Sequence, residues 1–260
     1  MKRFFVLILI LAIAAISLAG CSKGEKVIKV GVTDDYPPMG YRTSSDELEG
    51  FEVELAKELA KEMGSELEFV VIHREDMMGT LKDRTVDILI SSVSMTKSKS
   101  VYLDFTDPYL ANGSVIVTRP ELVDTITSIE SLAGMSAGVE AESTVDTIAS
   151  DLLGKIDFTL VRYETMSVCI AALKAEQLDC IICDMAVAID ICDKFPDQFE
   201  ISSAHLTNEP LGIAVNLGNE KLVHELNDAL AALKKDGVLS ELSEKYLGED
   251  YTQNIDTTLQ

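Results

Sequence analysis

The chain has 260 residues, and its 44 acidic against 22 basic side chains give a formal net charge of −22. A chain this acidic is repelled by nucleic acid and by anionic lipid headgroups, which argues against partners of either kind. The length suits one large or two small domains.

The N-terminus is typical of an export signal. Two basic residues precede an apolar run over residues 4–18, which is too short to span a bilayer comfortably. The sequence Leu-Ala-Gly-Cys that ends at Cys21 resembles the bacterial lipobox, in which cleavage before the cysteine leaves it lipidated. We therefore predict a signal peptide over 1–20 and a lipid-anchored linker over 21–26, with the rest of the chain extracytoplasmic and anchored to the cell membrane. The alternative is an ordinary export signal with an incidental cysteine.

The next part of the chain alternates predicted strands with predicted helices. The clearest helix covers residues 51–63, where Phe51, Leu55 and Leu59 form an apolar face and Gly64 follows as a stop signal. Such alternation is typical of a parallel sheet covered by helices. We also predict strands over 27–32, 67–72 and 86–90, a short helix over 76–81, and a mostly polar loop over 33–50.

A hydroxyl-rich turn follows the strand predicted over residues 86–90. Residues 91–99 read Ser-Ser-Val-Ser-Met-Thr-Lys-Ser-Lys, and we expect a helix to begin there. The free N–H groups and the positive dipole end of a helix attract a carboxylate or phosphate. The turn therefore predicts an anion site, although serines in this position also serve simply as helix caps.

The alternation restarts in the second half of the chain. Polar side chains again follow predicted strands, with Ser143 and Thr144 after one strand and Asp184 after another. Open sheets bind ligands at the carboxyl ends of their strands, so two such edges face to face would form a cleft. The predicted strands cover 114–118, 136–139, 158–161, 178–183 and 211–215. The predicted helices cover 144–152, 166–173, 186–192 and 220–235, and a last helix runs through residue 246 before a loose polar tail.

Four cysteines besides Cys21 lie in the second half of the chain. Cys180 and Cys183 fall in the strand predicted over 178–183, where residues three apart are about 10 Å from each other. This exceeds disulfide reach, which is about 7 Å between Cα atoms, so we interpret both as core residues. A bridge from Cys192 to either one remains open, since export permits disulfides.

Several motifs in this order resemble the polar amino-acid-binding family, family 3, of the bacterial extracytoplasmic solute-binding proteins of ABC importers. The resemblance covers about residues 27–248. Its motifs are Gly-Phe-Glu-Val-Glu-Leu-Ala at 50–56, Val-Asp-Ile at 86–88, Ser-Met-Thr at 94–96, Asp-Phe-Thr-Asp-Pro-Tyr at 104–109, Leu-Asp at 178–179 with Asp184, Lys-Lys-Asp-Gly at 234–237, and Tyr-Leu-Gly at 246–248.

The resemblance implies an α/β fold of two lobes, the type II periplasmic-binding-protein-like fold, with two hinge strands and a ligand cleft between the lobes. The crossings would lie at about 114–118 and 204–212. The implied parts are a first lobe over 27–114 plus 212–250, a second lobe with the hinges over 115–211, and a polar tail over 251–260.

The family's ligand contacts can be placed on this sequence. Its loop aromatic falls on Tyr36. Its serine turn falls on Ser92 and Ser94, whose N–H and hydroxyl groups would bind the α-carboxylate of the ligand. Its turn in the second lobe falls on Ser143 and Thr144, whose backbone N–H groups would bind the same carboxylate.

The remaining contacts include three departures from the family pattern. The acceptor for the ligand ammonium falls on Asp184, but Lys99 stands where the family has a carboxylate-binding arginine. Lysine is a point charge and cannot reproduce the arginine fork. Arg74 replaces a stacking aromatic, and Glu142 replaces a glycine. We hypothesise that Arg74 takes part in anion binding or pairs with Glu142 across the cleft.

The function implied is a lipid-anchored, non-enzymatic binding protein that captures a small zwitterionic solute, an amino acid or derivative, by lobe closure. It would act as a monomer and deliver the solute to an ABC permease and ATPase complex. One alternative is a dehydratase-like enzyme on the same scaffold, with Glu140 or Glu142 near Lys99 as acid or base. Another is a ligand-sensing partner of a membrane receptor. The three histidines are too scattered to suggest a metal site, and we expect no cofactor.

Overall fold

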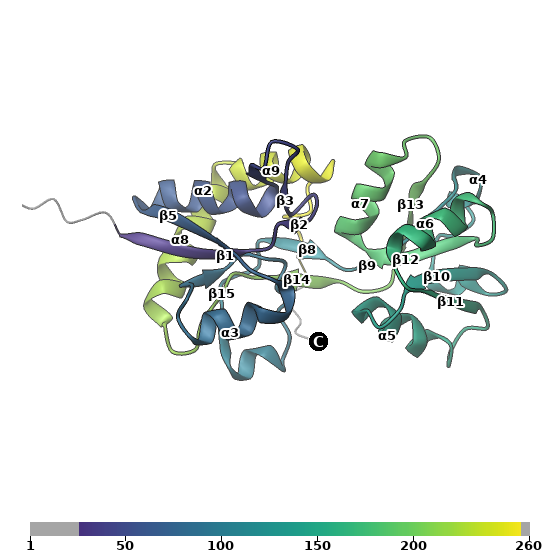
Figure 1. Ribbon diagram of the computed structural model, residues 1–260, viewed down its shortest axis with the longest axis horizontal. Helices are drawn as coiled ribbons and strands as arrows, with labels where there is room; N and C mark the ends of the chain where they lie inside the picture. Colours follow the sequence, from purple (N-terminus) through teal and green to yellow (C-terminus); the bar gives the residue numbers. More distant parts are fainter. Residues whose placement is uncertain (1–25, 256–260) are drawn as a thin grey trace, which may run out of the picture.

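The computed structural model describes residues 26–255, so the predicted signal peptide and Cys21 lie outside the described residues. The described chain forms two lobes, each built around a five-stranded sheet (Figure 1). This is the two-lobe α/β architecture predicted from the sequence.

The sheet of the first lobe has the strand order β5-β1-β6-β15-β7. Strand β1 lies between β5 and β6 and is parallel to both, whereas β15 pairs antiparallel with β6. Because β15 comes from near the end of the chain, two separate chain segments build this lobe. The strands are β1 (Val27–Val32), β5 (Glu66–Val71), β6 (Ile88–Leu89), β7 (Leu103–Phe105) and β15 (Ala214–Asn216).

Helices cover both faces of this sheet. The predicted apolar face of the first helix packs as expected, with Phe51, Leu55 and Leu59 buried in the main core. Gly64 ends that helix at φ 58°, a left-handed conformation that glycine adopts without penalty. The helices on this face are α2 (Phe51–Met63), α8 (Glu220–Lys235) and α9 (Val238–Leu247), and η1 (Arg74–Asp76) and α3 (Met77–Lys82) lie on the other.

The segment predicted as a polar loop over 33–50 forms a small three-stranded sheet instead. Strands β2 (Asp35–Tyr36), β3 (Gly40–Arg42) and β4 (Leu48–Glu49) pair antiparallel in chain order. Each strand has only two or three residues, which is too short for alternation of apolar and polar residues to be recognised.

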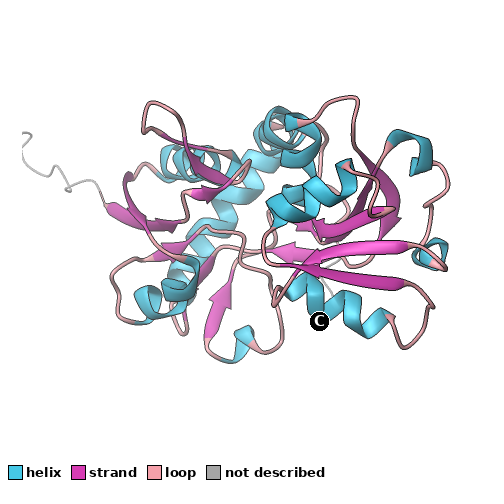
Figure 2. Ribbon diagram, turned by 45° about the vertical axis from the view of Figure 1, so that its right-hand side comes forward, coloured by secondary structure: helices cyan, strands magenta, loops and turns pink. Residues whose placement is uncertain are grey.

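The sheet of the second lobe has the strand order β11-β10-β12-β9-β13. Helices lie on both sides of it (Figure 2). The prediction missed β13, whose burial alternates. The strands are β9 (Ser114–Thr118), β10 (Ser136–Glu140), β11 (Thr159–Tyr163), β12 (Cys180–Asp184) and β13 (Glu200–His205). The helices are α4 (Pro120–Val123), η3 (Ile129–Leu132), α5 (Thr144–Leu152), α6 (Met166–Lys174) and α7 (Met185–Lys194).

Alternate residues of the central strands face opposite sides of this sheet. Val115 and Cys183 pack with α6 and α7, whereas Ile116 and Ile182 pack with α5. This two-sided burial explains why β9 and β12 read as continuous apolar runs. Asp184 is the last residue of β12 and therefore lies at the carboxyl edge of the sheet.

The lobes are connected by a pair of short antiparallel strands, β8 (Leu110–Asn112) and β14 (Glu209–Leu211). In Figure 1 both lie between the two sheets. The first crossing therefore comes earlier than the expected residues 114–118, because β9 is already part of the second sheet.

The structure contradicts the helix expected at the serine turn. Strand β6 ends at Leu89, and the first helical residues after it form only the short 3₁₀ helix η2 (Lys99–Val101). The intervening chain runs along the hinge, where Ser94 forms a β-bridge with Leu211 and the Met95 N–H donates to the carbonyl of Pro210 at 2.9 Å. Pairing with β14 satisfies backbone groups that a helix would otherwise have paired internally.

The tail beyond residue 248 was predicted to be loose, and its first residues are not. The Tyr251 carbonyl accepts a hydrogen bond from the N–H of Ala111 on β8 at 2.9 Å, and Thr252 is fully buried. The hinge strand is thereby held from a second side. Within residues 26–255, no helix has the length and apolar character needed to cross a bilayer.

Candidate functional site

Tyr36 and Asp184 meet across the two lobes. Tyr36 lies on β2 of the first lobe, and its hydroxyl donates to Asp184 Oδ2 at the end of β12, 3.4 Å away. The guanidinium carbon of Arg74 lies 4.7 Å from the centre of the Tyr36 ring, close enough for a cation–π contact. Three of the predicted site residues are therefore brought together here.

The surroundings of Asp184 disfavour the ionised form of its carboxyl group. Burial, and then the negative charge of Glu209, raise its pKa to about 6, while the Tyr36 hydroxyl and Arg74 oppose this shift. No cation lies within 4 Å of this carboxylate among residues 26–255. An ammonium group placed here would relieve the cost of burying the charge.

The N–H and hydroxyl groups of Ser92 are both hydrogen-bonded inside the first lobe. Its N–H and its hydroxyl donate to Glu52 Oε1 at 2.5 and 3.0 Å, and the Tyr109 hydroxyl donates to the same oxygen at 2.5 Å. Glu52 and Tyr109 are fully buried, and burial raises the pKa of both groups. Ser92 adopts φ 50°, so this bonded cluster fixes an unusual backbone conformation at the start of the turn.

Ser94 and Lys99 lie next to a residue that the sequence did not reveal, Glu209. The Ser94 hydroxyl donates to Glu209 Oε2 at 2.8 Å, and Lys99 Nζ donates to the Ser94 carbonyl at 3.1 Å. Burial and the charge of Arg74 lower the pKa of Lys99, while Glu209 opposes them. Glu209 precedes a proline on the hinge, and no local signal ties that position to the serine turn 115 residues away.

Ser143 and Thr144 lie at the start of α5 in the second lobe. Ser143 is the N-cap, and its Oγ accepts from the Asp146 N–H at 3.0 Å and donates to the Glu140 carbonyl at 2.7 Å. Thr144 is exposed. Within residues 26–255, no hydrogen bond or ion pair joins either residue to the Tyr36, Ser94 or Asp184 contacts.

Glu142 and Arg74 form no ion pair within 4 Å in the described part of the chain. Glu142 adopts φ 62°, a conformation that favours the glycine expected at this position from the resemblance.

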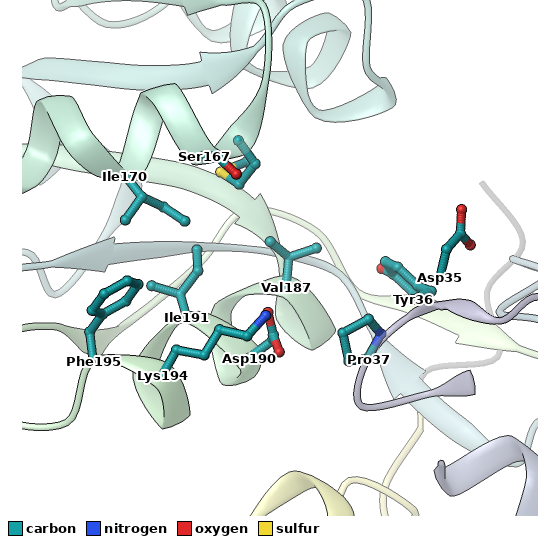
Figure 3. A pocket seen from close by; sticks show the side chains of 11 residues that line it. Asp35, Tyr36, Pro37, Ser167, Ile170, Val187, Asp190, Ile191, Lys194 and Phe195 are labelled. Atoms are coloured by element: carbon teal, nitrogen blue, oxygen red, sulfur yellow. The ribbon is translucent and has the colours of Figure 1, made fainter. Parts of the chain in front are cut away.

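Tyr36 also lines a separate groove of about 420 Å³ (Figure 3). Pro37 and Tyr36 form one end, Val187 and Ile191 line the wall contributed by α7, and Phe195, just after that helix, extends it. Neither Asp184 nor any residue of the serine turn lines this groove.

The cysteines carry no metal or disulfide chemistry in the described chain. Cys180 and Cys183 lie buried in β12, as predicted, and burial raises the pKa of both thiols. Cys169 and Cys192 are also free. Among residues 26–255 there is no group of three or more metal-ligating side chains.

Comparison with known proteins gives consistent matches over nearly all of the described chain. Residues 28–249 match the family described as bacterial extracellular solute-binding proteins, family 3. The chain is 28% identical over 231 residues to the L-cystine-binding protein TcyJ of Escherichia coli K12, covering 89% of this chain and 86% of that protein. It is 31% identical over 232 residues to ABC transporter arginine-binding protein 1 of the same strain, covering 87% and 93%.

Solved structures give the same picture. An ancestral arginine-binding protein bound to arginine is 30% identical, with a TM-score of 0.67, covering 86% of this chain and 99% of that one. The unliganded, open L-cystine solute receptor of Neisseria gonorrhoeae has a TM-score of 0.77 and 24% identity, covering 88% and 95%. The latter likeness supports the two-lobe fold alone.

Proposed function

Since the chain belongs to family 3 of the bacterial extracellular solute-binding proteins, we propose that it binds a small zwitterionic solute, an amino acid or a derivative of one, between its two lobes. The observation that carries this proposal is the half-buried carboxylate of Asp184, which faces Tyr36 of the opposite lobe and has no cation within 4 Å among residues 26–255. The names of the relatives, which bind L-cystine and arginine, support the amino-acid class.

Each charge of a zwitterion has a matching group in the cleft. Asp184 would accept the α-ammonium, and the Ser94 hydroxyl with Arg74 and Lys99 would bind the α-carboxylate. Arg74 can supply the planar fork that Lys99 lacks. Ser92, by this account, acts mainly by shaping the turn, because Glu52 already occupies its N–H and hydroxyl. Ser143 and Thr144 would reach the solute only as the second lobe closes.

Closure of the lobes would trap the solute. The lobes are connected by the paired strands β8 and β14, which suits a hinge movement of the two sheets relative to each other. The closed monomer would then deliver the solute to an ABC permease and ATPase complex. The lipid anchor at Cys21 would keep the protein at the membrane, and release of a Cys21→Ser variant from the membrane fraction would test it.

A thermal-shift screen of the purified protein against amino acids, dipeptides, polyamines and carboxylates tests the solute class. A true solute at about one hundred times its Kd should add about 2.7 kcal/mol to the free energy of unfolding. The absence of any shift with every amino acid would contradict the proposal. That the chain catalyses no reaction is part of the same proposal, and recovery of the bound solute unchanged after incubation tests it.

A further inference from the structure

The proposed cleft holds four charged side chains that lack an opposite partner. None of Arg74, Lys99, Asp184 and Glu209 takes part in an ion pair within 4 Å among residues 26–255. The charges still influence each other: Glu209 raises the pKa of Asp184 and Arg74 opposes this, whereas Glu209 raises the pKa of Lys99 and Arg74 lowers it. Two carboxylates and two cations are thus held close together but unpaired, an arrangement that a ligand with complementary charges would stabilise.

A chain of contacts connects Glu209 with Asp184. Glu209 Oε1 accepts from the Thr207 hydroxyl at 3.3 Å, and that hydroxyl accepts from the Ser114 N–H at 2.8 Å. Ser114 pairs in register with Asp184 across β9 and β12, so both side chains leave the same face of the sheet. The Ser114 hydroxyl is fully buried and has no hydrogen-bond partner in the described chain.

Glu209 has binding capacity to spare. Each of its oxygens accepts one hydroxyl hydrogen bond, from Ser94 and from Thr207, whereas an ionised carboxylate offers about four lone-pair sites. A simple zwitterion uses only Asp184 for its ammonium group and places no cationic group on Glu209.

We propose that Glu209 binds a second cationic group of the solute, so that the solute class is amino acids with two cationic nitrogen groups. This inference rests on the proposed function, because it assigns Asp184 to the first ammonium. Two kinds of solute share this chemistry: a dibasic amino acid such as arginine, and a molecule with two zwitterionic ends such as cystine. The second kind would also place a carboxylate on each of Arg74 and Lys99.

Isothermal titration calorimetry with the full-length protein tests this with two matched pairs of solutes. Citrulline has a neutral ureido group where arginine has its guanidinium. S-methylcysteine has one ammonium and one carboxylate where cystine has two of each. We expect the protein to bind arginine or cystine at least about 30-fold more tightly than its counterpart, as charged hydrogen bonds allow. A clear preference for cystine over arginine would support the form with two zwitterionic ends.

The variant Glu209→Gln keeps an acceptor for the Ser94 hydroxyl and removes the charge. In this variant the preference for the doubly cationic solute should fall to about threefold or less, while the affinity for the singly cationic counterpart changes little. Glu121→Gln, at an exposed glutamate on α4, is the matched control and should change no affinity.

The outcomes separate the two proposals. Failure of every amino acid to bind the wild-type protein would overturn the proposed function, and this inference with it. Binding of citrulline and S-methylcysteine as tightly as arginine and cystine would overturn the inference alone, and this comparison needs no variant. The inference would also be overturned if Glu209→Gln lowered the affinity equally for both solutes of a matched pair.

Discussion

The Ser94 hydroxyl donates a 2.8 Å hydrogen bond to the carboxylate of Glu209, and this bond ties the serine turn of the first lobe to hinge strand β14. The neighbouring Met95 N–H is bonded to the hinge carbonyl of Pro210. The turn is therefore held by the hinge, and a solute carboxylate that takes the Ser94 hydroxyl must displace Glu209. By the proposed function, solute binding would thereby be coupled to hinge strand β14.

Loss of the Ser94 hydroxyl should weaken solute binding. Ser94→Ala removes a donor for the α-carboxylate, and we expect the affinity to fall about 3- to 10-fold, as for a single hydrogen bond of about 0.5–1.5 kcal/mol. Calorimetric titration with the best solute from the screen measures this. Ser98→Ala, at an exposed serine of the same turn, is the control. Equal affinities of wild type and Ser94→Ala would remove Ser94 from the site.

The fold was predictable where local signals agree with tertiary packing. The first helix shows an apolar face and a terminal Gly64, and both features occur as predicted. Strands β9 and β12 are buried on both sides, so their apolar runs were recognisable from sequence. Such elements require no knowledge of distant partners.

The candidate site was less predictable because distant segments build it. The expected helix at the serine turn is absent since β14, more than a hundred residues later, pairs with that segment. The same pairing places Glu209 beside Ser94, and no residue spacing in the sequence indicates this contact. Tyr36 and Asp184 were placed by family resemblance, and their contact across the lobes depends on the arrangement of two sheets.

Glu52 should stabilise the turn as a hydrogen-bond acceptor rather than as a charge. Its Oε1 accepts all three hydrogen bonds from Ser92 and Tyr109, and a glutamine carbonyl can do the same. We expect Glu52→Gln to change the free energy of unfolding by less than about 1 kcal/mol, and Glu52→Ala to lower it by about 2–4 kcal/mol, because buried donors lose their acceptor. Urea denaturation distinguishes the two variants. Equal destabilisation by both would mean that the negative charge itself is required.

Asp184 should lower the stability of the solute-free protein near neutral pH. Its folded pKa, about 6, lies above the ordinary value of 3.8, so the folded state holds the proton more tightly than the unfolded chain. The stability contributed by this proton is complete below about pH 4 and is lost as the pH rises through about 6.

Asp184→Asn removes the titrating group and with it this loss of stability at rising pH. The variant should therefore gain thermal stability relative to wild type as the pH rises from 4 to 7.5, measured as the difference in Tm without solute. Asp124→Asn, at an exposed aspartate that follows α4 and takes part in no ion pair among residues 26–255, should show no such trend. A difference between Asp184→Asn and wild type that stays constant over this pH range would contradict the assignment of a raised pKa to Asp184.

Glu142 should carry backbone strain that glycine relieves. A non-glycine residue at φ 62° costs about 1–2 kcal/mol, part of which the greater freedom of glycine in the unfolded chain offsets. We expect Glu142→Gly to raise the free energy of unfolding by about 0.5–1 kcal/mol. Glu142→Ala removes the charge but keeps the strain, so it should bring no gain. A similar gain in both variants would assign the effect to charge.

The contact of the solute ammonium with Asp184 is the central claim, and a thermodynamic cycle tests it most directly. Calorimetry would compare the best amino acid and its deaminated analogue on wild type and on Asp184→Asn. On wild type, loss of the ammonium should weaken binding by about 1.5–3 kcal/mol, and on the variant the two solutes should bind with nearly equal affinity. The same loss on both proteins, with no coupling between the ammonium and Asp184, would contradict the account.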